Sequence, residues 1–128
     1  MILKFRTPVF CQNGHKAFWY WKVSPTRIAE VRNYGVPDDQ KCSCSKQGLG
    51  EGYVRAGHPD QLFTGWLDRE TQQNIYEGDI VIASYHWTEW HIIRLPQDFY
   101  DIQEFALGDD LSVVGSIFMN PEMAKAAK

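Results

Sequence analysis

Short runs of apolar and aromatic residues, separated by turn-forming residues, recur along the chain. Residues 2–6 alternate apolar and basic side chains, which predicts a half-buried first strand at a sheet edge, ending at Pro8. The Asn13-Gly14 pair predicts a hairpin turn, and the aromatic run at residues 17–23 predicts the second strand of that hairpin. Residues 27–34 predict a third strand of the same meander, with a single helical turn as the alternative.

Residues 35–59 show no regular hydrophobic period. The segment holds five Gly and two Pro, together with the Cys42-Ser43-Cys44 triplet. This composition predicts one long loop. A loop of this length inside a compact domain needs an additional constraint to hold it in place.

The second half of the chain repeats the strand-and-turn pattern. Strands are predicted at residues 63–67, 75–76, 80–85, 90–95 and 111–118. Residues 97–108 have apolar positions at helical spacing, so a short helix or an irregular lid competes with a strand there. Asn120, Pro121 and Glu122 predict the start of a short C-terminal helix, because they suit its N-cap, first position and first turn.

A chain of 128 residues with 14% aromatic residues fits one mainly-β domain with a substantial core. We expect residues 1–62 to supply an N-terminal β-meander and the cysteine-containing loop. Residues 63–128 are expected to supply a barrel part that ends in the short helix.

Charge bears on the class of partner. The chain has 13 Lys and Arg against 16 Asp and Glu, a net charge of −3, which argues against nucleic acid as the main ligand. A nucleic-acid-binding accessory protein stays an alternative, because six cations lie in the first quarter of the chain and Trp19, Trp21, Trp66 and Trp87 could act as stacking platforms. The sequence begins without a signal peptide and has no apolar run of about 18 residues, so a cytoplasmic protein without membrane contact is expected.

Four residues offer the soft ligands that a structural zinc ion takes. Cys11 and His15 flank the predicted Asn-Gly turn, and Cys42 and Cys44 lie in the long loop. A zinc ion bound by all four would fasten the loop to the first hairpin. His58 is a replacement ligand, and unligated thiols or a disulfide are the alternatives.

The segment around residues 85–91 gathers aromatic residues at a predicted hairpin tip. Together with one ring from the preceding strand they form the candidate binding surface: Trp66, Tyr85, Trp87 and Trp90. His86, Glu89 and His91 also raise a metal-dependent enzyme as a third hypothesis. These three residues lack a helix and a further partner at a recognisable spacing, so no catalytic residue is assigned.

Three blocks of the sequence resemble the YopX family of phage and prophage proteins. They are residues 2–6, Phe63-Thr64-Gly65 with residues 75–81, and residues 114–117 with 120–122. The resemblance implies an SH3-like β-barrel portion and an origin in a phage or prophage genome, with a bacterial host, and it implies no catalytic residues. Two features depart from the family's pattern, namely Trp66 in place of a common Leu and the turn at residues 68–74.

The leading hypothesis is a non-catalytic binding or assembly protein. It would act through strand edges and exposed aromatic residues on a protein partner or on a second copy of itself. The Cys and His set is not a general feature of the YopX family, so the zinc hypothesis depends on this sequence alone.

Overall fold

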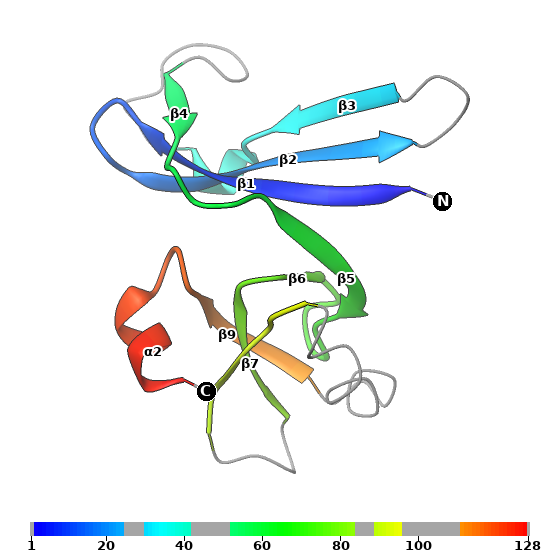
Figure 1. The fold of residues 1–128 in the computed structure, drawn as a ribbon, viewed down its shortest axis with the longest axis vertical. Coiled ribbons are helices and arrows are strands. Elements are labelled where there is room, and N and C mark those ends of the chain that lie inside the picture. The colour runs from blue at the N-terminus through cyan, green and yellow to red at the C-terminus, as the bar shows by residue number, and fades with distance from the viewer. Residues whose placement is uncertain (1, 25–29, 42–51, 84–88, 96–110, 128) are drawn as a thin grey trace. The chain divides into compact units, whose positions relative to one another are not determined.

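The computed structural model describes residues 2–24, 30–41, 52–83, 89–95 and 111–127. The fold is mainly β and its strands pair antiparallel, which confirms the fold class predicted from the hydrophobic pattern. The chain forms two compact units, Met1–Leu62 and Phe63–Lys128, whose elements are drawn in Figure 1. The SH3-like barrel stays a prediction.

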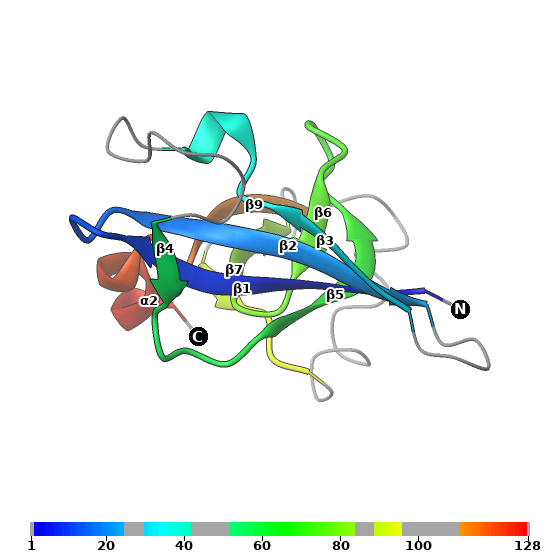
Figure 2. The same ribbon diagram turned by 90° about the horizontal axis from the view of Figure 1, so that it is seen from above.

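The first unit is a twisted sheet built on a three-stranded meander. Strands β1 (Leu3–Cys11), β2 (Lys16–Ser24) and β3 (Glu30–Gly35) pair in that order, and β2 lies between the other two in Figure 2. The short strand β4 (Tyr53–Arg55) pairs with the end of β1, and the first residues of β5 (Gln61–Leu67) pair with its beginning. A single turn of 3-10 helix, η1 (Asp38–Gln40), follows β3.

The prediction that the first strand lies at a sheet edge and ends at Pro8 is wrong. β1 has partners on both sides and continues to Cys11. Arg6, which suggested an exposed edge, is buried: its Nε donates to Gln61 Oε1 at 2.6 Å, and its guanidinium lies 4.0 Å from the centre of the Phe18 ring. A buried cation is acceptable where hydrogen bonds and an aromatic face replace its water.

Pro8 is tolerated inside β1 because the neighbouring ladder is interrupted beside it. Pairing with β5 stops at Arg6 and pairing with β4 starts at Val9, so no strand on that side requires an N–H from Pro8. The Pro8 carbonyl still accepts a hydrogen bond from the Ala56 N–H at 3.0 Å. On the other side, the facing Phe18 N–H donates to Gln40 Oε1 rather than to β1.

The third predicted strand is confirmed as β3, whereas the long loop at 35–59 is only partly a loop. That segment contains η1 and β4, and β4 is held by its pairing with Val9, Phe10 and Cys11. Backbone pairing of β4 with β1 therefore holds part of this segment in place. Residues 42–51 and the ambiguous segment 97–108 lie outside the described residues.

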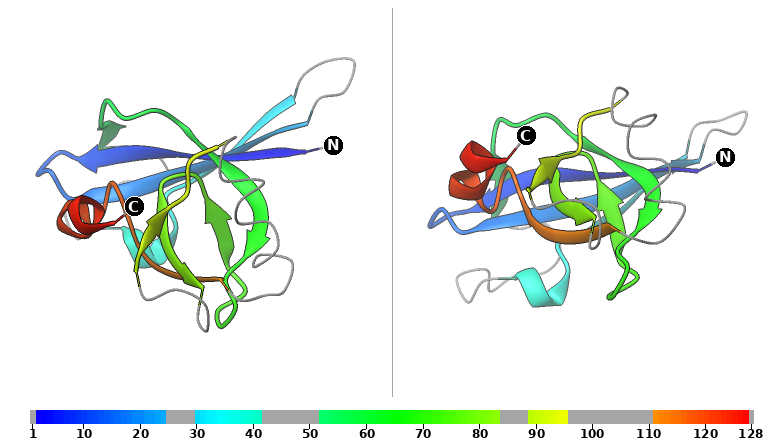
Figure 3. Two further views of the ribbon diagram at one scale, coloured as in Figure 1. Left: turned by 60° about the horizontal axis from the view of Figure 1, so that its bottom comes forward. Right: turned by 90° about the horizontal axis from the view of Figure 1, so that it is seen from below.

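In the second unit, β7 (Asp79–Ala83) pairs with β8 (His91–Ile92) on one side and with β9 (Leu111–Ser116) on the other. Figure 3 draws the ribbon in two further views. Phe63 and Leu67 of β5 pair with Tyr76 and Asn74 of β6 (Asn74–Tyr76), with an irregularity in β5 between them, and α2 (Pro121–Ala126) follows β9. The start of α2 at Pro121 confirms the predicted C-terminal helix. No helix in the described part of the chain is long and apolar enough to cross a membrane. Six buried side chains form the core of this unit: Trp66, Ile75, Val81, Ala83, Ile93 and Leu111.

A buried carboxylate, Asp68, joins the turn after β5 to β9. Its Oδ1 accepts the N–H groups of Glu70 and Thr71, each at 2.8 Å, and its Oδ2 accepts the Val113 N–H at 2.7 Å. Burial opposes ionisation of this carboxyl, but the N–H donors of Thr71, Val113 and Glu70 outweigh that effect and lower its pKa. The ionised side chain is thus a structural part of the turn.

We expect Asp68→Ala to lower the free energy of unfolding at neutral pH by about 1–3 kcal/mol, because it leaves three partly buried N–H donors without their acceptor. Urea unfolding of the purified variant measures this loss. The exposed neighbour Glu70 supplies the control, and Glu70→Gln should change stability by less than about 0.5 kcal/mol.

The loss of unfolding free energy caused by Asp68→Ala should depend on pH. Because the folded state lowers the pKa of Asp68, its contribution is complete above the unfolded-state pKa of about 3.9 and disappears as the pH falls through the lower folded-state value. The stability difference between wild type and Asp68→Ala should therefore narrow below about pH 4. A difference that stays constant into strong acid would contradict this assignment.

Candidate binding site on the N-terminal sheet

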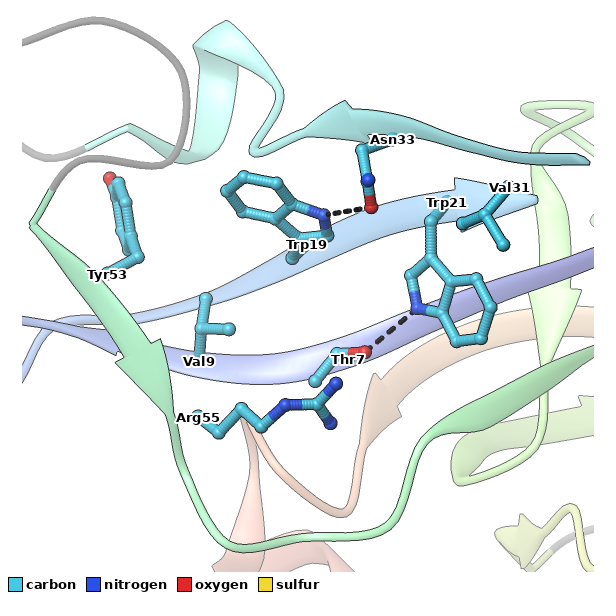
Figure 4. A pocket seen from close by; sticks show the side chains of 8 residues that line it. All are labelled: Thr7, Val9, Trp19, Trp21, Val31, Asn33, Tyr53 and Arg55. Carbon is cyan, nitrogen blue, oxygen red and sulfur yellow. Dashed lines mark hydrogen bonds between the residues drawn. The ribbon is translucent and has the colours of Figure 1, made fainter. Parts of the chain in front are cut away.

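One face of the first sheet carries a hollow lined by aromatic side chains. Alternation along β1 and β2 places Thr7 and Val9 on the same face as Trp19 and Trp21, with β3 and β4 on either side. The hollow has a volume of about 380 Å³. Its eight lining residues, drawn in Figure 4, are Thr7, Val9, Trp19, Trp21, Val31, Asn33, Tyr53 and Arg55.

The two indole rings are held in place by hydrogen bonds within the protein. Trp19 Nε1 donates to Asn33 Oδ1 at 3.1 Å, and Trp21 Nε1 donates to Thr7 Oγ1 at 2.9 Å, as the dashed lines in Figure 4 show. Trp21 also stacks on Phe5, with ring centroids 4.4 Å apart and planes 15° apart. Because both indole N–H groups already have acceptors, the rings are suited to bind a ligand through their carbon surfaces.

A polar chain supports one wall of the hollow. The buried Thr7 hydroxyl donates to Asp60 Oδ1 at 2.7 Å, and the Arg55 guanidinium lies 3.2 Å from the same oxygen. Asp60 therefore fixes both the hydroxyl that orients Trp21 and the one cation among the lining residues. Since Arg55 is largely exposed, this ion pair orients the side chain more than it stabilises the fold.

The lining residues offer a ligand several kinds of contact. The eight residues supply apolar, aromatic, hydroxyl and amide groups and a guanidinium. Val9 is part of a small buried cluster with Ala17 and Val36, against which Trp19 and Tyr53 pack. The hollow is thus a firm surface built on regular strands.

Cys11 and His15, two of the predicted zinc ligands, lie side by side. Cys11 Sγ is 3.3 Å from His15 Nδ1, and it accepts the N–H groups of Asn13 and His15, each at 3.3 Å. The turn between them requires Gly14, whose φ of 83° is unfavourable for other residues. Cys42 and Cys44 lie outside the described residues, within which no group of three metal-ligating side chains occurs.

Two of the four residues of the aromatic surface predicted in the second half of the chain are described, Trp66 and Trp90. Trp66 is only 7% exposed and belongs to the core of the second unit, so its inclusion in a binding surface is wrong. Trp90 is 36% exposed, whereas Tyr85 and Trp87 lie outside the described residues. Of the residues in the enzyme hypothesis, Glu89 and His91 are described and His86 is not.

Sequence reasoning selected Trp19 and Trp21 as candidate stacking rings but missed the rest of the hollow. Their spacing of two on a strand does predict a shared face. Asn33, Tyr53 and Arg55 come from β3 and β4, and only the pairing of those strands brings them beside the indoles.

A comparison with protein-family models finds none that matches the chain, and a comparison with curated proteins finds no significant match. The resemblance to the YopX family therefore stays a prediction.

We expect Thr7→Val to lower the free energy of unfolding by about 1–2 kcal/mol, because the new side chain keeps the shape but neither accepts from Trp21 nor donates to Asp60. Thr7→Ser retains the hydroxyl and should lower the free energy of unfolding by clearly less than Thr7→Val does. Urea unfolding followed by tryptophan fluorescence compares the two variants. Equal losses in both would show that the hydroxyl does not support the hollow.

Proposed function

We propose that this protein is a non-catalytic binding protein that captures an extended segment of a protein partner on its N-terminal sheet. The observation that carries the proposal is the hollow, with three aromatic rings lining a surface next to β3. Aromatic residues held in fixed orientations supply large contact area with little loss of conformational entropy on binding.

The position of β3 supports an extended ligand. β3 is the last strand in the order of its sheet, and no described strand pairs with its outer side. An outer strand presents unpaired backbone N–H and C=O groups, to which a partner segment can add as a further strand. Val31, which is 56% exposed, and Asn33 belong to β3 and also line the hollow, so an added strand would place alternate side chains beside it.

The source of the partner follows from the resemblance noted in the sequence. An origin in a phage or prophage genome would make the partner a phage protein, a protein of the bacterial host or a second copy of this chain. A cytoplasmic location belongs to the same proposal.

The test starts from peptides selected against the purified protein from a random peptide library, with affinities measured by isothermal titration. We expect Trp19→Ala to weaken binding about 30-fold, because a central aromatic contact typically contributes around 2 kcal/mol. Trp90→Ala is the matched control and should leave the affinity unchanged, since Trp90 lies outside the hollow. Thermal unfolding of both variants confirms that each is folded.

Two outcomes would contradict the proposal. Loss of binding in Trp90→Ala but not in Trp19→Ala would move the binding surface to the second unit. Failure to select any peptide, together with binding of a single-stranded oligothymidylate that Trp19→Ala abolishes, would favour nucleic acid as the ligand.

A specific observation keeps nucleic acid as the second candidate. Residues 1–62 carry nine Lys and Arg against five Asp and Glu, whereas residues 63–128 carry four against eleven. The unit that holds Trp19 and Trp21 is therefore basic even though the whole chain is acidic, and basic charge beside aromatic rings suits single-stranded nucleic acid. Only one cation, Arg55, lines the hollow itself, which is why a protein segment is preferred.

We also propose that Cys11 and His15 ligate a structural zinc ion together with Cys42 and Cys44. A tetrahedral zinc ion with usual bond lengths separates its sulfur and nitrogen ligands by roughly 3.6 Å. The 3.3 Å between Cys11 Sγ and His15 Nδ1 is close to that requirement, and N–H donors to the sulfur suit a thiolate.

Metal analysis of the purified protein should find about one zinc ion per chain under this proposal. Cys11→Ser and Cys42→Ser should each lose the zinc and lower the Tm by roughly 5–10 °C, because bound metal contributes folding free energy. His58→Ala should keep it, which separates His58 from the proposed ligands. Protein purified without zinc, or zinc retained in Cys11→Ser, would overturn the assignment.

A further inference from the structure

Three cations form a row across the face of the first sheet opposite the hollow. Lys4 on β1 is the register partner of Lys22 on β2, and Lys22 is the partner of Arg32 on β3. Directly paired residues project on the same side of a sheet, so the three side chains are neighbours. We call Lys4, Lys22 and Arg32 the cation row.

The Tyr34 side chain lies within the positive charge of this face. The ring is 51% exposed, and Lys22 Nζ lies 5.5 Å from its centroid. A hydrogen bond with Lys22 lowers the pKa of the Tyr34 phenol, and the positive charges of Lys22, Arg32 and Lys4 lower it further against the opposing effect of burial. The positive charges of all three residues of the cation row therefore act on the Tyr34 phenol.

The row gathers like charges on directly paired strands, and like charges in such positions repel each other. An ion pair at the row joins Arg32 to Glu30 at 3.9 Å, and solvent screens it because both side chains are mostly exposed. A negative group added next to Arg32 would be attracted by the positive charges of the row.

The geometry of an added strand specifies where that group must be. A residue placed opposite Arg32 on the outer side of β3 projects on the face of the cation row. Its two neighbours project on the other face, beside Val31 and Asn33, which line the hollow. One strand therefore presents an acidic side chain to the row and two other side chains to the aromatic hollow.

We propose that the partner is an extended acidic segment with the alternation apolar, Asp or Glu, apolar, whose carboxylate extends the row Lys4, Lys22, Arg32. This inference rests on the proposed binding of a protein segment to β3, and it specifies the chemistry of that segment. The apolar positions supply contact with the hollow, and the acidic position fixes the register in which the segment adds.

The probe is an acetylated and amidated peptide, Thr-Val-Glu-Val-Thr, extended by a fluorescein label, with a Thr-Val-Lys-Val-Thr peptide as its matched partner. Fluorescence anisotropy should show the glutamate peptide binding at least fivefold more tightly at low salt. Arg32→Glu should weaken the glutamate peptide about five- to tenfold and strengthen the lysine peptide. Lys125→Glu on α2 makes the same change of charge outside the row and should alter neither affinity.

A second peptide separates strand addition from simple charge attraction. The same glutamate sequence with N-methylated Val residues keeps its charge but loses backbone donors, so it should not bind measurably if the segment adds to β3. Equal binding of the methylated peptide would overturn the proposal, as would equal binding of the glutamate and lysine peptides by wild type. If oligothymidylate displaced the glutamate peptide and lost affinity in Arg32→Glu, the row would instead bind phosphates.

The two proposals fail in different ways. If Trp19→Ala weakens selected peptides while Arg32→Glu changes no affinity, the hollow binds a segment but the acidic register is wrong. If neither variant matters, the proposed function fails as well.

Discussion

The pairing of β1 with β2 is the constraint on which the rest of the first unit depends. Eight register pairs, from Leu3 with Val23 to Phe10 with Lys16, fix which side chains point to each face of the sheet. A slip of one residue would move the β2 indoles to the face of Arg6 and bring Lys22 to the hollow. The turn at residues 12–14 sets this register, because the Cys11 N–H donates to the His15 carbonyl at 3.0 Å and the Gly14 N–H donates to the Cys11 carbonyl at 2.9 Å.

One sheet thereby carries two chemically different faces. The first holds fixed indoles above a small apolar floor, and the second holds neighbouring cations around an exposed tyrosine ring. Since β3 contributes residues to both faces, the side chains of a single added strand would contact the hollow on one face and the cation row on the other. The second unit depends on a different kind of contact, in which the buried carboxylate of Asp68 accepts the N–H of Val113 near the start of β9.

Local patterns in the sequence predicted the local structure well. Alternation, the Asn-Gly pair and the Asn-Pro-Glu start of α2 indicated strands, a turn and a helix where they occur. They could not place β1 in the middle of its sheet, because its contacts with β4 and β5 join residues that are 42–57 positions apart in the sequence. The burial of Trp66 was missed for another reason. A large aromatic residue on a strand is suited to a core as well as to a surface, and the local pattern does not distinguish the two.

The interruption beside Pro8 has a consequence for how the chain can vary. The connection from β4 to β5 leaves β1 after Ala56 and returns at Asp60, so residues 57–59 contribute no rung to the ladder. Insertions there would leave the register of β1 unchanged, whereas deletions would draw Asp60 away from Thr7 and Arg55. Related chains should therefore accept a longer connection more readily than a change in the spacing between Thr7 and Trp21.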